Sequence, residues 1–306
     1  MTHKILSTNA ERPICYASFI GQMMLGAGML LASYFAHAAI GDIGTYTSST
    51  KTFSTASYWI EGTDGVVMID TQFLPKEGLE ALALAEKITG KKVSTAIVLH
   101  PNPDKFNGTA VYQARGIKVV TSKQVAELIP AVHKIRYGWF FDEYKPDYPK
   151  DAAEPSLFGE SITNLRLHGL NLKLHVLGKG ASGAHVVVEH QKSVFVGDLI
   201  NPSNHAWLEL GLIGEWLARL HEIKLMQPTR IFPGRGLSGD VSLIDGQAQY
   251  LRQVQTWVRE DKPSGKIGFL AKRTLQNKIE QAYPKLGYPI FMRDGLPAVW
   301  ETEGTK

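Results

Sequence analysis

Apolar and polar residues follow two different periods along this chain, and the period predicts where strands and helices lie. Short runs rich in Val and Ile predict strands, and apolar residues spaced three or four positions apart predict helices. The two kinds of segment alternate in two successive blocks, which indicates an α/β fold with two similar halves. The predicted strands are Phe53–Glu61, Gly65–Asp70, Val93–Leu99, Gly116–Thr121, Ile162–Leu167, Leu172–Leu177, Val186–Glu189, Ser193–Val196 and Arg230–Phe232, and the predicted helices are Pro75–Ile88, Asn107–Arg115, Lys123–Leu128, Leu212–Ile223 and Ser242–Glu260.

Segment Ala131–Glu160 breaks this alternation. Aromatic residues stand there among prolines and charged residues, and we expect an irregular segment. It is either a surface excursion whose aromatic side chains pack on the body or a lid over a pocket, since long loops in compact domains are often functional. The aromatic residues are Tyr137, Trp139, Phe140, Phe141, Tyr144 and Tyr148.

The composition is that of an ordinary globular protein. Of 306 residues, 44% are hydrophobic and 20% are charged, which is enough to bury a sizeable core. The formal net charge of +4 is small for this length. It therefore gives no basis for expecting a nucleic acid or an anionic membrane surface as a partner.

The first 38 residues have the pattern of a secretory signal peptide. Lys4 and Arg12 precede the short apolar run Met23–Phe35, and an A-x-A site follows it. We expect cleavage before Ala39 and an exported, periplasmic protein; an uncleaved membrane anchor is the alternative. The single cysteine, Cys15, lies in this leader, so the mature chain would contain neither a disulfide nor a Cys metal ligand.

Five short motifs at predicted strand ends carry a family resemblance. Their order and spacing resemble the metallo-β-lactamase fold superfamily from about Gly44 to Glu260. The resemblance implies a four-layer αββα sandwich with the site at one edge of two sheets. It also implies one domain over residues 39–306, in which residues 131–160 are an insertion or lid. The motifs are "GVVMIDT" at Gly65–Thr71, "LHPNPDKFNG" at Leu99–Gly108, "GKGASGAH" at Gly178–His185, "FVGDLI" at Phe195–Ile200 and "FPGRG" at Phe232–Gly236.

The resemblance also implies a set of zinc ligands, which this chain keeps only in part. The superfamily places ligands in an H-x-H-x-D-H loop, a G-H-T-x-G loop, a GD dipeptide and a PGHG loop. Imidazole and carboxylate groups suit zinc, which lowers the pKa of a bound water to near neutrality. The retained positions are His100, Asp104 and Asp198, and the histidine positions that carry another residue are Asn102, Lys105, Ala181 and Arg235.

The replacements indicate a change of chemistry at these positions. Lys105 and Arg235 are donor-only cations that offer a metal no lone pair while they are charged. Two nearby aspartates favour the charged form of a lysine. We therefore interpret Lys105 and Arg235 as electrostatic substitutes for the metals, and Asp104 and Asp198 as their ion-pair partners.

Several residues near the motifs can be interpreted either as structural residues or as functional ones. His100 is either a strand-end structural residue or part of the site. His185 lies four residues after the expected ligand position and could rotate inward as a substitute ligand, although a hydrogen-bonded role is the simpler interpretation. Asp70 is interpreted as a structural support of the metal loop, and His205 could line the same pocket.

These observations leave two functional hypotheses. The first is an exported pseudoenzyme that has lost dizinc hydrolysis and serves as a binding or scaffold factor in the cell envelope. Its partner would be an envelope protein or a small anionic ligand bound by the Lys/Arg pair. We expect no binding to nucleic acid, and we expect contact with a membrane only if the leader is not cleaved. We expect this pocket to be lined by Asn102, Ala181, His185, Asp198, Arg235, Trp139 and Phe140.

The second hypothesis is a working hydrolase, β-lactamase-like or lactonase-like. Zinc is then a possible cofactor, although none is favoured. Catalysis would use either one weakly held metal or metal-free acid–base chemistry; a serine nucleophile is not indicated, because the chain has no G-x-S-x-G motif. The candidate metal ligands are His100, Asp104, His185 and Asp198, and the candidate catalytic residues are His100, Asp104 and Lys105.

Overall fold

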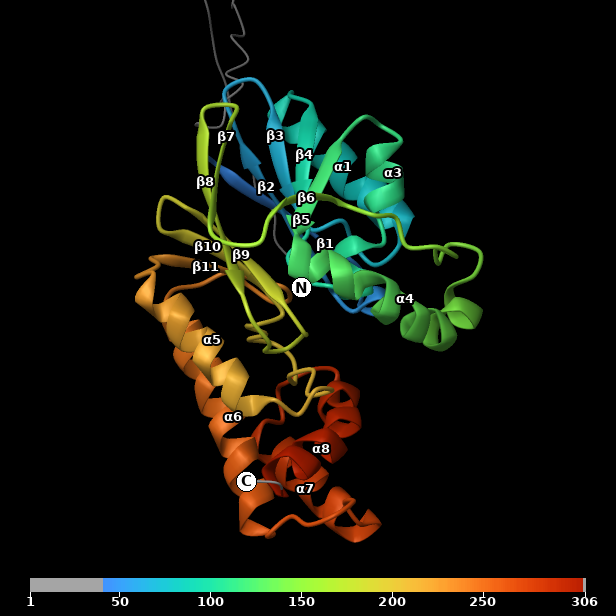
Figure 1. Ribbon diagram of the computed structural model, residues 1–306, viewed down its shortest axis with the longest axis vertical. Helices are drawn as coiled ribbons and strands as arrows, with labels where there is room; N and C mark the ends of the chain where they lie inside the picture. Colours follow the sequence, from blue (N-terminus) through green and yellow to red (C-terminus); the bar gives the residue numbers. More distant parts are fainter. Residues whose placement is uncertain (1–40, 305–306) are drawn as a thin grey trace, which may run out of the picture. The chain divides into compact units, whose positions relative to one another are not determined.

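Two β-sheets form the centre of residues 41–304, which are the residues that the computed structural model describes (Figure 1). The predicted leader, with Cys15 and the cleavage site before Ala39, lies outside them. The first sheet has the order β1-β2-β3-β4-β5-β6 and the second β11-β10-β9-β8-β7. The strands are β1 (Ile43–Thr47), β2 (Ala56–Glu61), β3 (Val66–Ile69), β4 (Val93–Ile97), β5 (Lys118–Ser122), β6 (Ser156–Gly159), β7 (Thr163–Leu167), β8 (Leu170–Leu177), β9 (His185–His190), β10 (Ser193–Gly197) and β11 (Arg230–Pro233).

Helices cover the outer faces of the two sheets. The first sheet packs against α1, α3 and α4, and the side of the second sheet away from the first packs against α5 and α6 (Figure 1). The predicted four-layer α/β sandwich is therefore confirmed. The helices are α1 (Pro75–Thr89), α2 (Pro103–Phe106), α3 (Thr109–Gln113), α4 (Lys123–Tyr144), α5 (Ile213–Leu225), α6 (Ser242–Glu260), α7 (Phe269–Ala282) and α8 (Pro289–Gly304), with one 3-10 turn at Thr50–Thr52.

The central strands follow directly from their sequence. All four residues of β3 are buried, as expected for a strand covered on both faces. β3, β4, β5 and β6 run parallel, so the chain must cross over between them through helices. The "GTDG" turn closes the β2–β3 hairpin through a hydrogen bond from Gly62 N–H to Gly65 O of 2.9 Å. This topology brings the loops after β4, β10 and β11 to one edge.

The prediction of an irregular segment over Ala131–Glu160 is wrong for its first half. α4 continues through Pro130 to Tyr144. A proline inside a helix removes one hydrogen bond, but the buried residues Val125, Ile129, His133 and Arg136 keep helical spacing and pack on the body. The packing of this helix face on the body therefore outweighs the destabilising effect of the proline on the helix.

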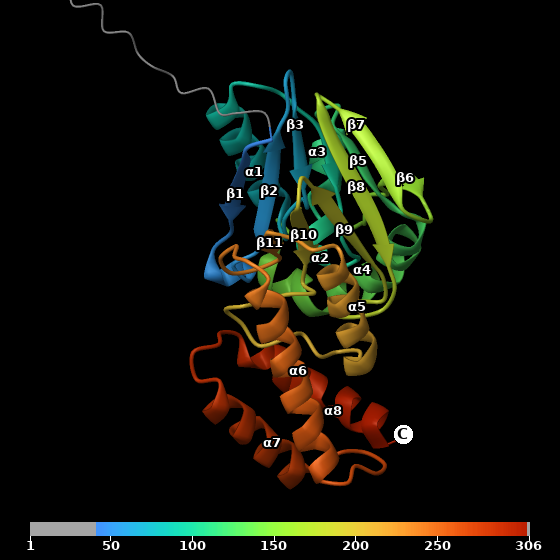
Figure 2. The same cartoon turned by 90° about the vertical axis from the view of Figure 1, so that its left-hand side faces the viewer.

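The C-terminal part of the chain holds two helices that the sequence pattern does not predict. Figure 2 shows α6, α7 and α8 packed together beyond the sheets. Leu275 and Ile279 of α7 and Met292, Leu296 and Val299 of α8 are fully buried in one core with α6. None of the described helices has the length and hydropathy that a membrane span needs.

Candidate functional site

The motif loops meet where β4, β10 and β11 end. β10 and β11 are parallel, so Asp198 after β10 and Arg235 after β11 reach the same edge of the second sheet. Lys105 lies on the short helix α2, whose four residues are all buried. Thr71 fixes the backbone there, because its N–H and its hydroxyl both donate to Lys105 O, at 2.8 and 2.9 Å.

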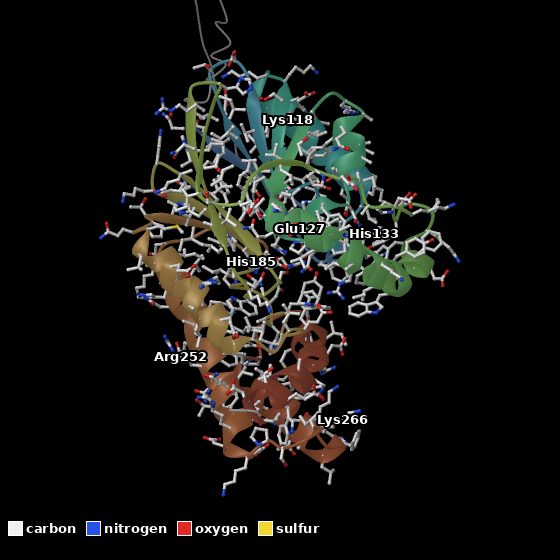
Figure 3. All side chains as sticks on the ribbon, in the orientation of Figure 1. Lys118, Glu127, His133, His185, Arg252 and Lys266 are labelled. Carbon is white, nitrogen blue, oxygen red and sulfur yellow. The ribbon has the colours of Figure 1, made fainter. Side chains whose placement is uncertain are left out.

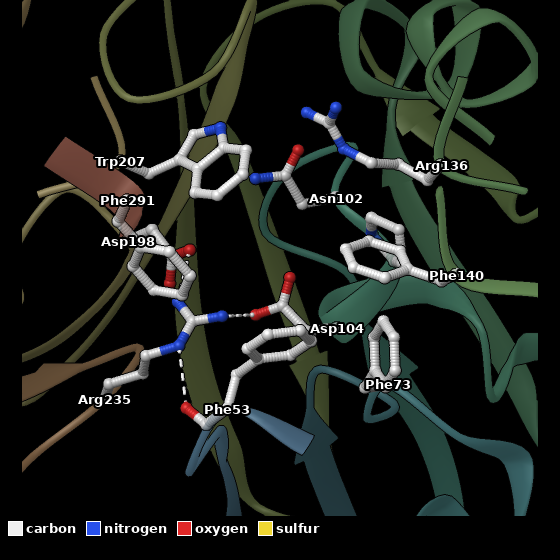
Figure 4. Close-up of a pocket in the computed structure, with 11 residues that line it drawn as sticks. Phe53, Phe73, Asn102, Asp104, Arg136, Phe140, Asp198, Trp207, Arg235 and Phe291 are labelled. Atoms are coloured by element: carbon white, nitrogen blue, oxygen red, sulfur yellow. Dashed lines mark hydrogen bonds and ion pairs between the residues drawn. The ribbon is translucent and has the colours of Figure 1, made fainter. Parts of the chain in front are cut away.

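The centre of the site is a buried cluster of two cations, Lys105 and Arg235, and two anions, Asp104 and Asp198. Figure 4 shows Arg235 and the two aspartates. Lys105 Nζ lies 2.9 Å from Asp104 Oδ2 and 3.2 Å from Asp198 Oδ1. Arg235 Nη2 donates to Asp104 Oδ2 at 2.6 Å, and its Nη1 donates to Asp198 Oδ2 at 2.5 Å. Arg235 Nε donates to Phe53 O at 3.0 Å. The sequence therefore led to the residues of this cluster, and the structure places them in direct contact.

The charges of the cluster hold one another in the ionised form. Burial by itself would raise the pKa of Asp104, but Lys105 and Arg235 outweigh it and lower that pKa. The same cations lower the pKa of Asp198 well below its usual range, again against the effect of burial. Burial also opposes the charge of Lys105, but the two aspartates raise its pKa. The four groups therefore form a neutral set at physiological pH.

Asp70 lies beside this cluster and behaves differently. Burial raises its pKa to about 8, because Lys105 Nζ, 4.0 Å away, compensates only part of the desolvation. Asp70 Oδ1 accepts a hydrogen bond from Leu99 N–H at 2.9 Å, next to the loop that carries His100. This contact is the supporting role that the sequence suggested for Asp70.

His100 and His185 hold the loop at residues 178–185 through contacts with Ser182. His185 Nε2 accepts a hydrogen bond from Ser182 N–H at 2.9 Å, and burial lowers the pKa of His185 well below its usual range. His100 Nδ1 lies 3.3 Å from Ser182 Oγ, and its Nε2 accepts from Asp198 N–H at 3.3 Å. Both rings are fully buried. In Figure 3, His185 lies near the sheets and His133 lies apart from it on α4.

The residues of this site do not fit the dizinc centre that the family resemblance implies. Within residues 41–304, no three His, Cys, Asp or Glu side chains are grouped to hold a metal ion. Lys105 Nζ and the Arg235 guanidinium lie between the carboxylates, in the space that a metal would need. The candidate ligand set His100, Asp104, His185 and Asp198 is therefore not assembled as a metal site.

A pocket opens directly above the cluster (Figure 4). Four of the predicted lining residues line it, namely Asn102, Phe140, Asp198 and Arg235. Three others do not: Ala181 and Trp139 line two adjacent recesses, and His185 is buried below the surface. Lys105 is fully buried as well. The complete lining is Phe53, Phe73, Asn102, Pro103, Asp104, Arg136, Phe140, Asp198, Trp207, Arg235 and Phe291.

Several lining residues escaped the sequence analysis. Phe53 begins one predicted strand and Phe73 follows another, and no motif singles out either residue. Trp207 and Phe291 come from segments with no predicted element, and only their aromatic character could have served as a signal. His205 does not line the pocket; its Nδ1 is 3.0 Å from Tyr250 Oη in the core.

Helix α4 forms one wall of the pocket. Its residues Phe140 and Tyr144, with Tyr148 beyond it, pack against Phe73 at ring-centroid distances of 5.0 to 5.5 Å. Of these aromatic residues, Phe140 lines the pocket, and Tyr144 and Tyr148 pack against Phe73.

An ion pair ties α4 to the loop before α5. Arg136 donates with both terminal nitrogens to the carboxylate of Glu209, one of them at 2.9 Å. Trp207 Nε1 donates to the same carboxylate at 2.8 Å. The Arg136 guanidinium also lies 4.1 Å from the centroid of the Trp139 ring. Both terminal nitrogens of Arg136 are therefore engaged with Glu209.

A sequence model described as "Metallo-beta-lactamase superfamily" matches residues 50–235. The chain belongs to the metallo-beta-lactamase superfamily. The match contains every motif of the cluster and ends at Arg235, so α6, α7 and α8 lie beyond it.

Known proteins agree with this assignment at low identity. The chain is 24% identical over 188 residues to the metallo-beta-lactamase type 2 of Bacillus cereus and, equally, to that of Bacillus sp. (strain 170). Each match covers 59% of this chain and spans 66% of the relative's length.

Solved structures share the fold. A metallo-beta-lactamase from Pontibacter korlensis has a TM-score of 0.55 and 20% identity, over 69% of this chain and 94% of that one. The metallo-beta-lactamase FIM-1 from Pseudomonas aeruginosa, in its mono-zinc form, has a TM-score of 0.53 and 18% identity, over 69% and 89% of the two chains. The family and the fold expected from the motifs are thus confirmed.

Proposed function

We propose that this superfamily member works without metal-dependent hydrolysis and uses its pocket to bind a partner. The observation that carries the proposal is the placement of Lys105 Nζ and the Arg235 guanidinium between the carboxylates of Asp104 and Asp198. Two aspartates buried here would be destabilising without partners, and the two cations supply those partners from within the chain.

Admission of zinc would require both cations to leave. Lys105 would have to lose its proton, but its pKa is raised by the aspartates. Arg235 stays protonated in proteins and makes three hydrogen bonds here. The exchange would therefore break a neutral, hydrogen-bonded cluster before the first ligand bond formed.

Metal-free acid–base catalysis has little support in the same geometry. The side chains of His100 and Lys105 are both 0% exposed, so neither presents its nitrogen to the pocket. A general base must come within hydrogen-bond reach of the proton that it removes. We therefore favour a binding role over the hydrolase alternative.

We further propose that the protein acts in the cell envelope. The support is the leader pattern of residues 1–38 and the absence of cysteine from the chain after it. Expression of the full chain in a Gram-negative host, followed by fractionation and intact-mass analysis, tests this part. We expect a periplasmic species that begins at Ala39; a full-length product in the membrane fraction would favour the anchor instead.

Metal analysis of the purified protein tests the binding role. We expect no retained zinc after dialysis against zinc-containing buffer and desalting. Hydrolysis of a chromogenic cephalosporin and of a simple lactone should stay at the rate without protein, with or without added zinc. Near-stoichiometric zinc, together with hydrolysis that a chelator abolishes, would overturn the proposal. Hydrolysis that survives chelation would instead support metal-free catalysis.

A further inference from the structure

The walls of the pocket are a continuous belt of aromatic rings. Trp207 contacts Phe291 at a ring-centroid distance of 4.9 Å, and Phe291 contacts Phe53 at 5.9 Å. Phe53 in turn contacts Phe73 at 5.0 Å and Phe140 at 5.6 Å. These five rings come from five separate stretches of the chain, yet they surround one space in Figure 4. Such walls favour a flat apolar ligand group.

The floor of the pocket offers one strong hydrogen-bond acceptor. Asp104 Oδ2 accepts hydrogen bonds from Arg235 and, at 3.4 Å, from the hydroxyl of Thr55, and it lies 2.9 Å from Lys105 Nζ in an ion pair. Its other oxygen, Oδ1, has no hydrogen-bond partner among residues 41–304, and Figure 4 shows it directed toward the space between the rings. Because Asp104 is ionised and only 5% exposed, a ligand group at this oxygen should be a donor.

The pocket gives a charged ligand little compensation for leaving water. Arg235 uses its three donor groups on Asp104, Asp198 and a carbonyl, and Arg136 is bound to Glu209. An anion would therefore find each lining arginine already engaged and would face a carboxylate oxygen. A cation would face two guanidinium groups. Burial of an uncompensated ligand charge is unfavourable in either case.

We infer that the pocket binds an uncharged, single-ring aromatic ligand whose hydroxyl or N–H group donates a hydrogen bond to Asp104 Oδ1. The space among the lining residues is about 390 Å³ when the open mouth is included, and only about 40 Å³ of it can hold the centre of a water-sized sphere, so the pocket has no room for more than one ring with small substituents. This inference rests on the proposed binding role and names the ligand class for it. It replaces the anionic ligand that the Lys/Arg pair suggested in the sequence.

Four probes that share one ring test the inference on the purified protein. Phenol is neutral and donates a hydrogen bond; toluene is neutral without a donor; benzoate is an anion and benzylamine a cation at pH 7. Ligand-observed NMR titration should rank phenol first. We expect its affinity to exceed that of toluene by about tenfold, since a bond to a charged group is the difference between them. Preferred binding of benzoate or benzylamine, or no binding of phenol, would overturn the inference.

Two substitutions place the binding in this pocket. Phe140→Ala removes one wall and should weaken phenol binding at least about fivefold, because it removes a stacked ring. Asn102→Phe fills the space instead, and the Asn102 side chain makes no capping hydrogen bond to α2 that folding would lose. The matched control is Phe269→Ala, at a phenylalanine that is 76% exposed on α7. Equal affinity in all three variants would refute the site.

The zinc measurement and the phenol titration together distinguish this inference from the proposed function on which it rests. A protein that retains no zinc and binds no phenol contradicts only the ligand class. A protein that retains near-stoichiometric zinc and shows hydrolysis that a chelator abolishes contradicts the proposed function, whatever the probes do.

Discussion

At the residue scale, Lys105 shows how a side chain can supply a positive charge to buried carboxylates from within the chain. An ammonium group neutralises nearby carboxylates as a cation does, but it offers no lone pair and activates no water. Its position between Asp104 and Asp198 gives both carboxylates a cationic partner. The stabilising effect of Lys105 depends on the two aspartates being buried with it. A substitution of Lys105 therefore tests this effect directly.

We predict that Lys105→Met destabilises the fold strongly. Methionine fills a similar volume but leaves the buried carboxylates of Asp104 and Asp198 with one partner fewer. Removal of one member of a buried ion pair usually costs about 3–5 kcal/mol of unfolding free energy. Urea denaturation followed by circular dichroism measures the change.

The control for this experiment is Lys76→Met. Lys76 pairs with Asp147 at 2.6 Å, but both side chains are well exposed, at 58% and 42%. Solvent screens such pairs, so the urea midpoint should hardly move. A Lys105 variant as stable as the Lys76 variant would contradict the electrostatic role of Lys105.

A second prediction concerns pH and Asp70. In the folded chain its pKa is about 8, and in the unfolded chain a carboxyl titrates near 4. Between these values the folded state holds a proton that the unfolded state lacks. The contribution of Asp70 to stability therefore falls as pH rises, by about 1.4 kcal/mol per pH unit, and levels off above pH 8.

Asp70→Asn isolates this contribution. Asp70 has a positive φ of 63°, which asparagine tolerates, and the amide oxygen can still accept from Leu99 N–H. Urea unfolding at pH 5.5, 6.5 and 7.5 should show the wild type losing stability relative to the variant as pH rises. Parallel pH curves for the two proteins would show that Asp70 is ionised in the fold.

The sequence predicted the charged residues of the site better than its apolar walls. Asp104, Lys105, Asp198 and Arg235 stand at motif positions, and their charges alone suggested ion pairs. The aromatic lining carries no such pattern, because a phenylalanine in a pocket wall looks the same as one in a core. Its position depends on long-range packing, which a local pattern does not encode.

At the element scale, α4 is the main difference between sequence and structure. The pattern predicted a helix only over Lys123–Leu128, and the helix continues through Pro130 to Tyr144. The edge strands β1 and β6 were missed for a related reason: both are partly exposed and lack a continuous apolar run. Elements whose stability comes from packing rather than local propensity are those that local patterns miss.

We predict that the far half of α4 depends on its ion pair with the next loop. Arg136→Met removes the bonds to Glu209 and should raise amide hydrogen exchange over residues 131–144 by about tenfold, since a bond to a charged group is worth about 1.5 kcal/mol or more. Exchange in β3 and β4 should stay unchanged. Mass spectrometry of peptic fragments measures both.

The matched control lies on the same helix. Lys123→Met breaks an exposed pair with Glu160, whose side chains are 44% and 64% accessible, and should leave exchange over residues 131–144 as it is. If the Arg136 variant exchanged no faster than the Lys123 variant, packing of the aromatic side chains would hold α4 without the ion pair.

At the scale of the whole molecule, a superfamily sandwich is joined to a helical part that completes the pocket. The family match ends at residue 235, and Phe291 of α8 comes from beyond it. Tyr288 Oη, just before α8, donates to Thr50 O and lies 3.0 Å from Ser54 Oγ. Two distant parts of the chain therefore build one wall. A sequence motif could not have predicted this shared wall, because the contact between the two parts exists only once both have folded.

The same sandwich should still hold the geometry of a metal site. We predict that four substitutions made together, Asn102→His, Lys105→His, Ala181→His and Arg235→His, confer zinc binding. They remove both internal cations and place imidazoles at the positions that the superfamily uses, beside the retained His100, Asp104 and Asp198.

Two measurements on this variant decide the prediction. Equilibrium dialysis with metal analysis should show zinc that the wild type does not retain. Zinc should also raise the unfolding temperature of the variant alone, because a ligand at a hundredfold excess over its dissociation constant stabilises the folded state by about 2.7 kcal/mol. The control variant keeps Lys105 and Arg235 and carries only Asn102→His and Ala181→His. It should bind no zinc, since both cations still occupy the site. Zinc binding by this double variant would show that the cations do not exclude the metal.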